Sequence, residues 1–286
     1  MLISPEIESL IDRALAEDLS IGDPTTTILI PPRLAARADL VAKAEGILAG
    51  VDVALAVFRR VDRSLQTRAL IEDGMALEVG LRIATVEGPA SSILQAERTA
   101  LNFLQRLCGI ATETSRYVRA AAGHKVRIVD TRKTTPGLRA LEKYAVRCGG
   151  GRNHRQNLGD GILIKDNHIQ ALRGNGLSLG EIIGKARAGA SHTIRVEVEV
   201  EDLTAVKEAL DAGAEVLLLD NMELEEMARA ATLARGRAVT EASGGIDLAS
   251  VRDVAATGVD LISVGALTHS PRALDISLDL VQTGKL

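Results

Sequence analysis

The side chains with the clearest chemical potential are cations gathered between residues 125 and 168. This segment holds ten Lys or Arg against four Asp or Glu, a net charge of +6 in a chain whose net charge is −4. Three glycines at 149–151 stand directly before the run RNHR at 152–155. Arginine binds carboxylates and phosphates bidentately, and glycine lets backbone amides approach an anion closely. The segment therefore predicts an anion-binding site, with a solvated helix face as the alternative that any charge run allows.

Carboxylates follow the cations at a constant step. Glu199, Asp220 and Glu241 are spaced 21 residues apart, about the length of one strand and one helix. Glu199 and Asp220 could form ion pairs with the lysines and arginines. They could instead hold Mg²⁺, which prefers oxygen ligands and often also contacts substrate phosphates. Both interpretations stay open at this point.

Two turns that contain small residues complete the set of candidates. Ser243, Gly244 and Gly245 follow one apolar run, and Gly265 and Ala266 follow the last one. Loops after the last two strands are a usual phosphate site of barrels. Each turn alone is weak evidence, because loops between strands and helices use glycine routinely. Together with the carboxylates, the two turns predict a site for a metal-bound sugar phosphate.

The candidate residues lie at the ends of short apolar runs, which occupy 126–130, 161–166, 194–200, 215–221, 237–245 and 260–267. Most runs precede a helical pattern, and this βα repetition predicts a parallel sheet whose ligand site lies at the carboxyl ends of the strands. Roughly 160 residues suit an open or incomplete (β/α) barrel better than a complete one, which needs about 250. A Rossmann fold is the alternative, but no GxGxxG follows a first strand.

The first part of the chain predicts a smaller N-terminal α+β domain. Ser4, Pro5 and Glu6 are typical of a helix start, and an alternating apolar pattern near residues 77–88 indicates a strand. A helical pattern over 91–107 leads into the barrel. We therefore expect an N-terminal domain over 1–109, joined by the C-terminal tail 274–286, and a catalytic barrel over 110–273.

Composition excludes several classes of partner. A net charge of −4, with no Trp, two Tyr and two Phe, argues against nucleic acid. Cys108 and Cys148 lie far apart without a CxxC pattern, so neither a disulfide framework nor a zinc site is indicated. The first residues have neither a basic start nor a long apolar run, which argues against a signal peptide or a membrane span. These features predict a cytoplasmic protein that binds no membrane.

Several motifs resemble the quinolinate phosphoribosyltransferase family. They are DTRKTTPGLRALEKYAVRCGGGRNHR, LIKDNHI, VEVEVEDL, LLLDN, EASGGI and DLISVGALTHSPRALDISLDL, with ALAEDLSIGD and AERTALNFLQRLCGIAT nearer the front. The resemblance implies an N-terminal α/β domain, an open α/β barrel and a homodimer, or a higher oligomer, in which one chain completes the other's site. It also implies the Mg²⁺-dependent reaction of quinolinate with phosphoribosyl pyrophosphate, which gives nicotinate mononucleotide, pyrophosphate and CO₂ in de novo NAD synthesis.

The resemblance also implies roles for single residues. The anion-binding residues for quinolinate and pyrophosphate are Arg132, Lys133, His154, Arg155 and Lys165, with Arg98 contributed by the partner subunit. Glu199 and Asp220 face the ribose hydroxyls and hold the metal, either directly or through its water ligands. Ser243, Gly244, Gly245 and Gly265, with the adjacent Ala266, match the loops that hold the 5′-phosphate. Among these, Lys133, Lys165, Glu199 and Asp220 are the expected catalytic residues.

Three other functions remain open from the sequence. A paralogue associated with molybdenum transport resembles the same family and acts on another substrate. Lys165 at a strand end could form a Schiff base, as in barrel aldolases. A regulatory anion-binding surface is the non-enzymatic alternative, although Glu199 and Asp220 beside the cations fit catalysis on a metal-bound substrate better.

Overall fold

The computed structural model describes residues 3–281, and its contacts divide the chain into two compact units. The first unit comprises 1–113, 136–150 and 270–286, and the second comprises 114–135 and 151–269. The predicted boundary at 109/110 falls near the first break between the units. The segment 136–150, which we expected within the barrel domain, groups with the first unit instead. Part of the predicted tail, 282–286, lies outside the described residues.

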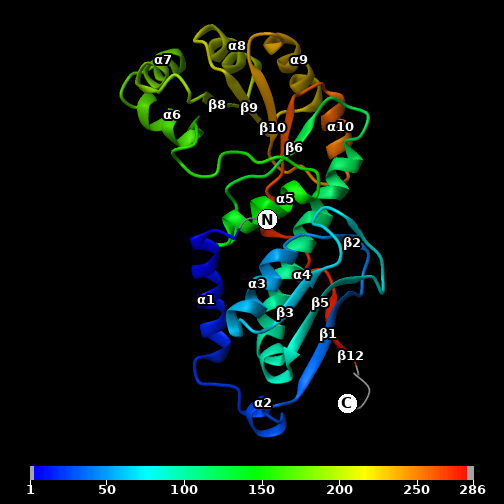
Figure 1. Ribbon diagram of the computed structural model, residues 1–286. Helices are drawn as coiled ribbons and strands as arrows, with labels where there is room; N and C mark the ends of the chain where they lie inside the picture. Colours follow the sequence, from blue (N-terminus) through cyan, green and yellow to red (C-terminus); the bar gives the residue numbers. More distant parts are fainter. Residues whose placement is uncertain (1–2, 282–286) are drawn as a thin grey trace. The chain divides into compact units, whose positions relative to one another are not determined.

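The first unit is built on an antiparallel sheet with strand order β12-β1-β5-β3 (Figure 1). Strand β12 pairs with β1 from Ile276 to Val281, so the tail joins the N-terminal sheet as expected. Strands β2 and β4 of this unit form a separate two-stranded antiparallel sheet. The strands are β1 (Ala35–Ala42), β2 (Gly46–Ile47), β3 (Gln66–Ala69), β4 (Ala76–Leu77), β5 (Arg82–Pro89) and β12 (Ile276–Val281).

Helices of the first unit follow the signals in the sequence. Helix α1 begins at Pro5, and the Ser4 hydroxyl accepts a hydrogen bond from the Ile7 N–H at 3.4 Å. Its buried residues are Ile7, Ile11 and Leu15, which form one helical stripe. Helix α4 is much longer than the predicted 91–107 and continues into the second unit. The helices are α1 (Pro5–Leu19), α2 (Pro24–Leu29), α3 (Val51–Val61), α4 (Ala90–Ala120) and α5 (Arg139–Cys148).

The second unit contains a six-stranded parallel sheet with strand order β6-β11-β10-β9-β8-β7. Strands β6 and β7 are the two edges of this sheet and do not pair with each other in the described part of the chain. The sheet is therefore an open (β/α) barrel, which confirms the predicted fold. Figure 1 shows α8 and α9 packed along strands β8–β10. The strands are β6 (Arg127–Val129), β7 (Ile162–Ile164), β8 (Val196–Val200), β9 (Val216–Asp220), β10 (Val239–Ser243) and β11 (Leu261–Ser263). The helices are α6 (Asp166–Arg173), α7 (Leu179–Gly189), α8 (Leu203–Asp211), α9 (Leu224–Ala234), α10 (Val251–Ala256) and α11 (Ala266–His269).

Alternation along the strands sets the direction of the candidate side chains. In β8, the sequence VEVEV places Val196, Val198 and Val200 on one face and both glutamates on the other. Strand register then aligns Glu199 with Leu218 of β9, and Asp220 of β9 with Ser243 of β10. Polar side chains of neighbouring strands are therefore brought to one face near the carboxyl ends.

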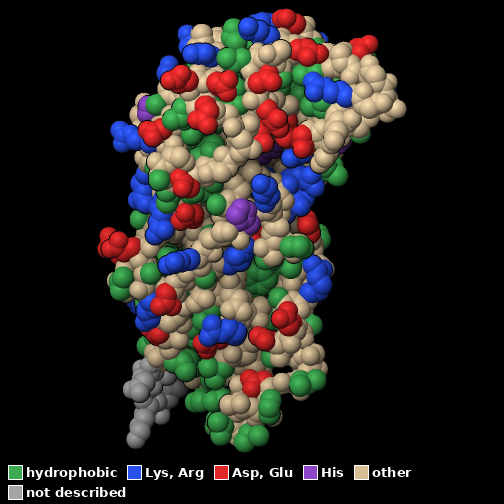
Figure 2. Space-filling model, turned by 180° about the vertical axis from the view of Figure 1, so that it is seen from behind, with side chains coloured by type: hydrophobic (Ala, Val, Ile, Leu, Met, Phe, Trp, Pro, Cys, Tyr) green, Lys and Arg blue, Asp and Glu red, His purple; other side chains and the backbone are tan. Residues whose placement is uncertain are grey.

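The face of the molecule shown in Figure 2 has no single basic stripe. On the side shown in Figure 2, Lys and Arg are interspersed with Asp and Glu rather than gathered into one basic stripe. Such a stripe is what a nucleic-acid-binding surface requires. Within residues 3–281, no helix combines the length and the apolar character needed to cross a bilayer.

Candidate active site

A cavity of about 760 Å³ lies at the carboxyl ends of the barrel strands in the second unit. Its volume falls in the range of small-molecule sites, which is about 300–1,000 Å³. The cavity brings together all of the predicted site residues except Arg98. The predicted residues that line it are Arg132, Lys133, His154, Arg155, Lys165, Glu199, Asp220, Ser243, Gly244, Gly245, Gly265 and Ala266.

Four of the ten cations of segment 125–168 line this cavity rather than a solvated helix face, and anion binding by these four stays a prediction. Arg155 donates from Nη1 to the Gly161 carbonyl at 3.0 Å, and burial, followed by the charge of Arg132, lowers the pKa of its guanidinium. The Arg132 Nε is buried and has no hydrogen-bond partner among the described residues. A buried, unsatisfied guanidinium nitrogen in a cavity wall is well suited to an anionic ligand.

The other six cations of the segment do not line the cavity. Lys143 is 1% exposed on helix α5 of the first unit. Gly149 and Gly150 end that helix, with Gly150 in the left-handed region at φ 87°, and neither lines the cavity. Gly151 does not line the cavity either. The conformational freedom of Gly149 and Gly150 is used to terminate a helix, and the approach of backbone amides in this run to an anion stays a prediction.

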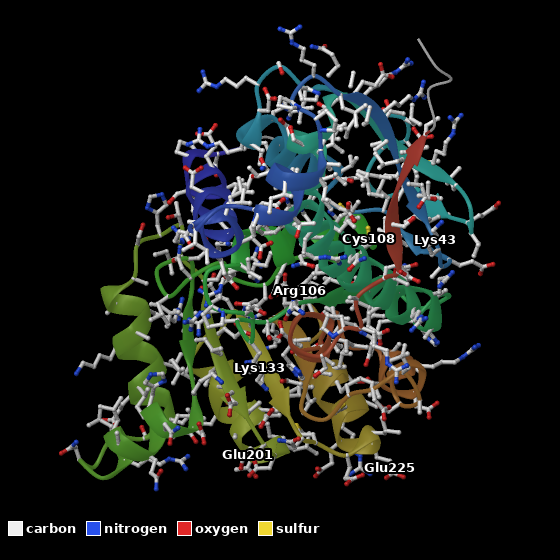
Figure 3. All side chains as sticks on the ribbon, turned by 90° about the horizontal axis from the view of Figure 1, so that it is seen from below. Lys43, Arg106, Cys108, Lys133, Glu201 and Glu225 are labelled. Carbon is white, nitrogen blue, oxygen red and sulfur yellow. The ribbon has the colours of Figure 1, made fainter. Side chains whose placement is uncertain are left out.

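Lys133, labelled in Figure 3, is held at its backbone by two hydroxyl groups. Its N–H donates to the Thr131 Oγ1 at 3.0 Å, and its carbonyl accepts from the Thr268 Oγ1 at 2.8 Å. Its side chain passes close to Gly265, where an added Cβ would lie 3.0 Å from the Lys133 Cδ. Gly265 therefore leaves the space that the lysine side chain occupies.

The acidic side of the cavity is formed by neighbouring strands. The Lys165 Nζ lies 3.6 Å from the Glu199 Oε2, so the ion pair that we considered from the sequence is present. Burial raises the pKa of Glu199; Lys165 opposes this effect and Asp220 adds to it. Two carboxylates at the ends of adjacent strands are also hard oxygen donors of the kind that Mg²⁺ takes. The geometry therefore accommodates both interpretations.

His154, which lines the cavity, meets two buried carboxylates. Its Nε2 lies 3.1 Å from the Glu197 Oε2 and 3.5 Å from the Glu241 Oε2. Its Nδ1 accepts a hydrogen bond from the Arg155 N–H at 2.7 Å, so the ring proton belongs on Nε2 and points toward the carboxylates. A protonated Nε2 is no metal ligand, so the arrangement favours a hydrogen-bonded cluster over a metal site at these three residues.

The carboxyl group of Glu241 has a raised pKa. It is 1% exposed, and burial, reinforced by the charge of Glu197, raises its pKa to about 7. One oxygen of each carboxyl group, the Oε1 of Glu197 and of Glu241, is buried without a hydrogen-bond partner among the described residues. Alternation along β8 and the 21-residue step pointed to both residues, but the sequence did not place them beneath His154.

Asp130 is a further supporting residue that we did not include among the predicted site residues. It is fully buried, and it accepts from the His154 N–H at 2.8 Å and from the Asn153 Nδ2 at 2.6 Å. These bonds hold the backbone of the RNHR run at the end of β6. The only signal in the sequence was the place of Asp130 at the end of its apolar run.

Arg98 belongs to a different unit of the chain from the other predicted site residues. It belongs to the part of α4 that groups with the first unit, its side chain is exposed, and it is absent from the cavity lining among the described residues. Within one chain, the structure therefore does not include Arg98 in the cavity.

Comparison with known proteins gives a consistent picture. The family model for the quinolinate phosphoribosyl transferase N-terminal domain matches residues 23–108, and the model for its C-terminal domain matches residues 110–279. A probable nicotinate-nucleotide pyrophosphorylase (carboxylating) from Bacillus subtilis is 44% identical over 96% of this chain and 93% of its own length. The nicotinate-nucleotide pyrophosphorylase (carboxylating) of Mycobacterium leprae is 45% identical over 94% of this chain and 95% of its own.

Solved structures agree with these relatives. The crystal structure of NadC from Streptococcus pyogenes has a TM-score of 0.93 at 42% identity and covers 98% of this chain and 99% of its own. The agreement includes both the antiparallel first unit and the open barrel, since nearly the whole chain is aligned. The chain belongs to the quinolinate phosphoribosyltransferase family.

Proposed function

We propose that this chain transfers the phosphoribosyl group of phosphoribosyl pyrophosphate to quinolinate, with release of pyrophosphate and CO₂, to form nicotinate mononucleotide. The observation that carries the proposal is the composition of the cavity in a chain of this family. Four cations, two strand-end carboxylates and two small-residue loops line one space of about 760 Å³. That set matches a dianionic acid that meets a ribose with phosphate groups at both ends.

The cations bind the charged ends of both substrates. Quinolinate has two carboxylates, and pyrophosphate leaves with more negative charge than any other group in the reaction. Arg132 and Arg155 offer planar forks for carboxylates, whereas Lys133 and Lys165 act as point charges. Since the charge of the leaving pyrophosphate grows in the transition state, fixed cations there lower the barrier more than they strengthen substrate binding.

The carboxylates and loops hold the phosphoribosyl group. Glu199 and Asp220 accept hydrogen bonds from the ribose hydroxyls, and Gly244 and Gly245 present backbone amides to the 5′-phosphate. The same two carboxylates fit Mg²⁺, since they are hard oxygen donors on adjacent strands. When bound, Mg²⁺ neutralises charge on the pyrophosphate.

The reaction itself requires no protein nucleophile. The pyridine nitrogen of quinolinate attacks C1 of the ribose while the C1–O bond to pyrophosphate breaks and its electron pair leaves with pyrophosphate. The pyridine nitrogen becomes cationic, so it stabilises the electron pair left on C2 when the adjacent carboxylate departs as CO₂. A proton then takes the place of the carboxylate. The chain's part is to position and stabilise charge.

Schiff-base chemistry at Lys165 is not supported by its surroundings. A nucleophilic lysine needs a neutral amine, which desolvation or nearby cations provide. The Lys165 side chain is 50% exposed, and the charged group that it contacts, at 3.6 Å, is the Glu199 carboxylate rather than a cation.

Arg98 completes the active site of a partner subunit in a homodimer, as the family resemblance implies, and the chain works in the cytoplasm, where thiols stay reduced. Complementation tests the dimer. Arg98→Ala and Lys133→Ala are each expected to lose activity, but mixing them under conditions that exchange subunits should restore up to about a quarter of wild-type activity. In mixed dimers, one of the two sites contains both native residues. No recovery, with exchange shown by native mass spectrometry, contradicts a shared site.

The activity is tested with purified protein, phosphoribosyl pyrophosphate, Mg²⁺ and either quinolinate or nicotinate. We expect nicotinate mononucleotide by chromatography and labelled CO₂ from carboxyl-labelled quinolinate, with little product from nicotinate. Product from nicotinate alone would contradict the role of the second carboxylate. Product from neither acid would move the assignment to a relative that acts on another substrate.

A further inference from the structure

Asn221, the residue after Asp220, has an unusual backbone conformation. Its φ is 51°, and no other non-glycine residue in the described range 3–281 has a positive φ. The left-handed region costs most L-residues about 1 kcal/mol or more, and asparagine is among the residues that tolerate it best. A conformation of this kind at the edge of a ligand cavity is a reason to look for a function.

The side chain of Asn221 is bonded to the carboxylate that precedes it. Its Nδ2 donates to the Asp220 Oδ2 at 2.8 Å. The Asn221 N–H donates to the Ser243 carbonyl at 3.0 Å and so extends the pairing of β9 with β10 by one residue. Asn221 therefore joins the acidic residue at the end of one strand to the loop that follows the next strand.

Gly244 packs directly against this asparagine. An added Cβ at Gly244 would overlap the Oδ1 and Cγ of Asn221 and would lie 2.9 Å from its backbone nitrogen. Gly244 is itself in a positive-φ conformation at 99°, whereas the space around Gly245 is open. The close contact restricts the rotation of the Asn221 side chain, so its amide stays aimed at Asp220.

We propose that Asn221 is a positioning residue that fixes the Asp220 carboxylate relative to loop 243–245. The inference rests on the proposed function, in which Asp220 faces the ribose and its metal and the loop takes the 5′-phosphate. Both groups belong to one substrate, so their spacing must match a rigid phosphoribosyl unit. The asparagine amide, held by Gly244 on one side and bonded to Asp220 on the other, sets that spacing before the substrate arrives.

The first test separates the amide from the backbone conformation. Asn221→Gly keeps the left-handed backbone and removes the amide, whereas Asn221→Ala removes the amide and adds strain. We expect both variants to weaken binding of phosphoribosyl pyrophosphate with Mg²⁺, measured by calorimetry, about tenfold or more. Only Asn221→Ala should also lower the thermal midpoint clearly. If Asn221→Gly binds this substrate as the wild type does, the backbone alone matters and the inference is wrong.

A control and a kinetic comparison define the effect further. Asn175→Gly removes another exposed amide, which donates to the Ala171 carbonyl at 3.1 Å, and should change neither binding nor turnover. In Asn221→Gly, the KM for quinolinate should stay within about twofold of the wild-type value while kcat/KM for phosphoribosyl pyrophosphate falls. Equal losses for both substrates would show a general defect of the barrel and overturn the inference.

The second test asks whether Asn221 acts through Asp220. In the Asp220→Asn background, Asn221→Gly should add less than about a twofold loss of binding, since the partner that it positions is already altered. Additive losses would contradict this role. If the wild-type protein binds phosphoribosyl pyrophosphate but makes no product, the proposed reaction is refuted. The positioning role of Asn221 is then still decided by the binding constants of the wild type and its variants for this substrate. A wild-type protein that does not bind this substrate refutes both.

Discussion

The buried carboxyl group of Glu241 makes the stability of the protein depend on pH in a defined direction. Its pKa is raised from 4.5 to about 7 in the folded protein, chiefly by burial and then by Glu197. The folded state therefore binds the proton more tightly than the unfolded state does. The stabilising effect of the proton bound to Glu241 is fully present below pH 4.5 and is lost as the pH rises through about 7.

The expected magnitude follows from the size of the change. A pKa that moves from 4.5 to about 7 corresponds to roughly 3 kcal/mol of unfolding free energy, at about 1.4 kcal/mol per pH unit. His154, whose Nε2 lies 3.5 Å from the Glu241 Oε2, limits the rise in the pKa of Glu241. Glu241→Gln is neutral at every pH, so it resembles the protonated wild type and lacks this loss.

The assay is urea unfolding followed by circular dichroism at several pH values between 5 and 8. The unfolding free energy of Glu241→Gln minus that of the wild type should rise by about 1–3 kcal/mol between pH 5 and pH 8. Glu181→Gln is the matched control: Glu181 is exposed, and hydrogen bonds from Ser178 lower its pKa below 4.5. Its proton-linked change in stability lies below pH 4.5, so the Glu181→Gln and wild-type curves should stay parallel between pH 5 and 8. If the wild-type and Glu241→Gln curves stay parallel over this range, the assignment of a raised pKa to Glu241 is refuted.

Three further predictions concern small changes at defined places. Gly109→Ala should destabilise the protein by about 2 kcal/mol or more in urea unfolding, because the new Cβ meets the Arg272 backbone carbonyl. Gly184→Ala in α7, where the space around the glycine is open, should stabilise the protein by about 0.5–1 kcal/mol. Equal effects of the two substitutions would contradict the packing argument. Gly265→Ala should lower kcat about tenfold with little change in thermal midpoint, because its Cβ would lie 3.0 Å from the Lys133 Cδ; unchanged turnover would show that the lysine has room to move. Burial raises the pKa of the Cys148 thiol to about 11, so a thiol reagent at pH 8 should react with it far more slowly than with glutathione, and comparable rates would show that the thiol is accessible and ionised.

Much of the barrel could be predicted because its strands have a strong signal in the sequence. Each of the six apolar runs between 126 and 267 contains one strand of the parallel sheet. Parallel strands bring their carboxyl ends to one edge, so residues as distant in the chain as Lys133 and Gly265 were expected in one place. The long extension of α4 was missed, since the apolar spacing near 91–107 says nothing about where a helix stops.

The charge run shows where the sequence could not decide. Arg132 and Lys143 belong to the same cationic segment, yet one lines the cavity and the other is buried on a helix of the first unit. Net charge is a property of the whole segment, whereas exposure to the cavity depends on where the chain leaves the sheet after β6. The strand-end position, rather than the number of charges, was the informative signal.

The conformation of Asn221 illustrates a limit of a different kind. An Asp-Asn pair after a strand is compatible with an extended chain or a turn, so the sequence did not set Asn221 apart from its neighbours. The left-handed backbone becomes understandable only with Gly244 in place, because any larger residue there would overlap the asparagine side chain. Each residue therefore restricts the other, and the restriction acts on Asp220 through a hydrogen bond of 2.8 Å. A site that must hold a rigid phosphoribosyl group gains from such mutual restriction, since the order is imposed during folding rather than at the moment of binding.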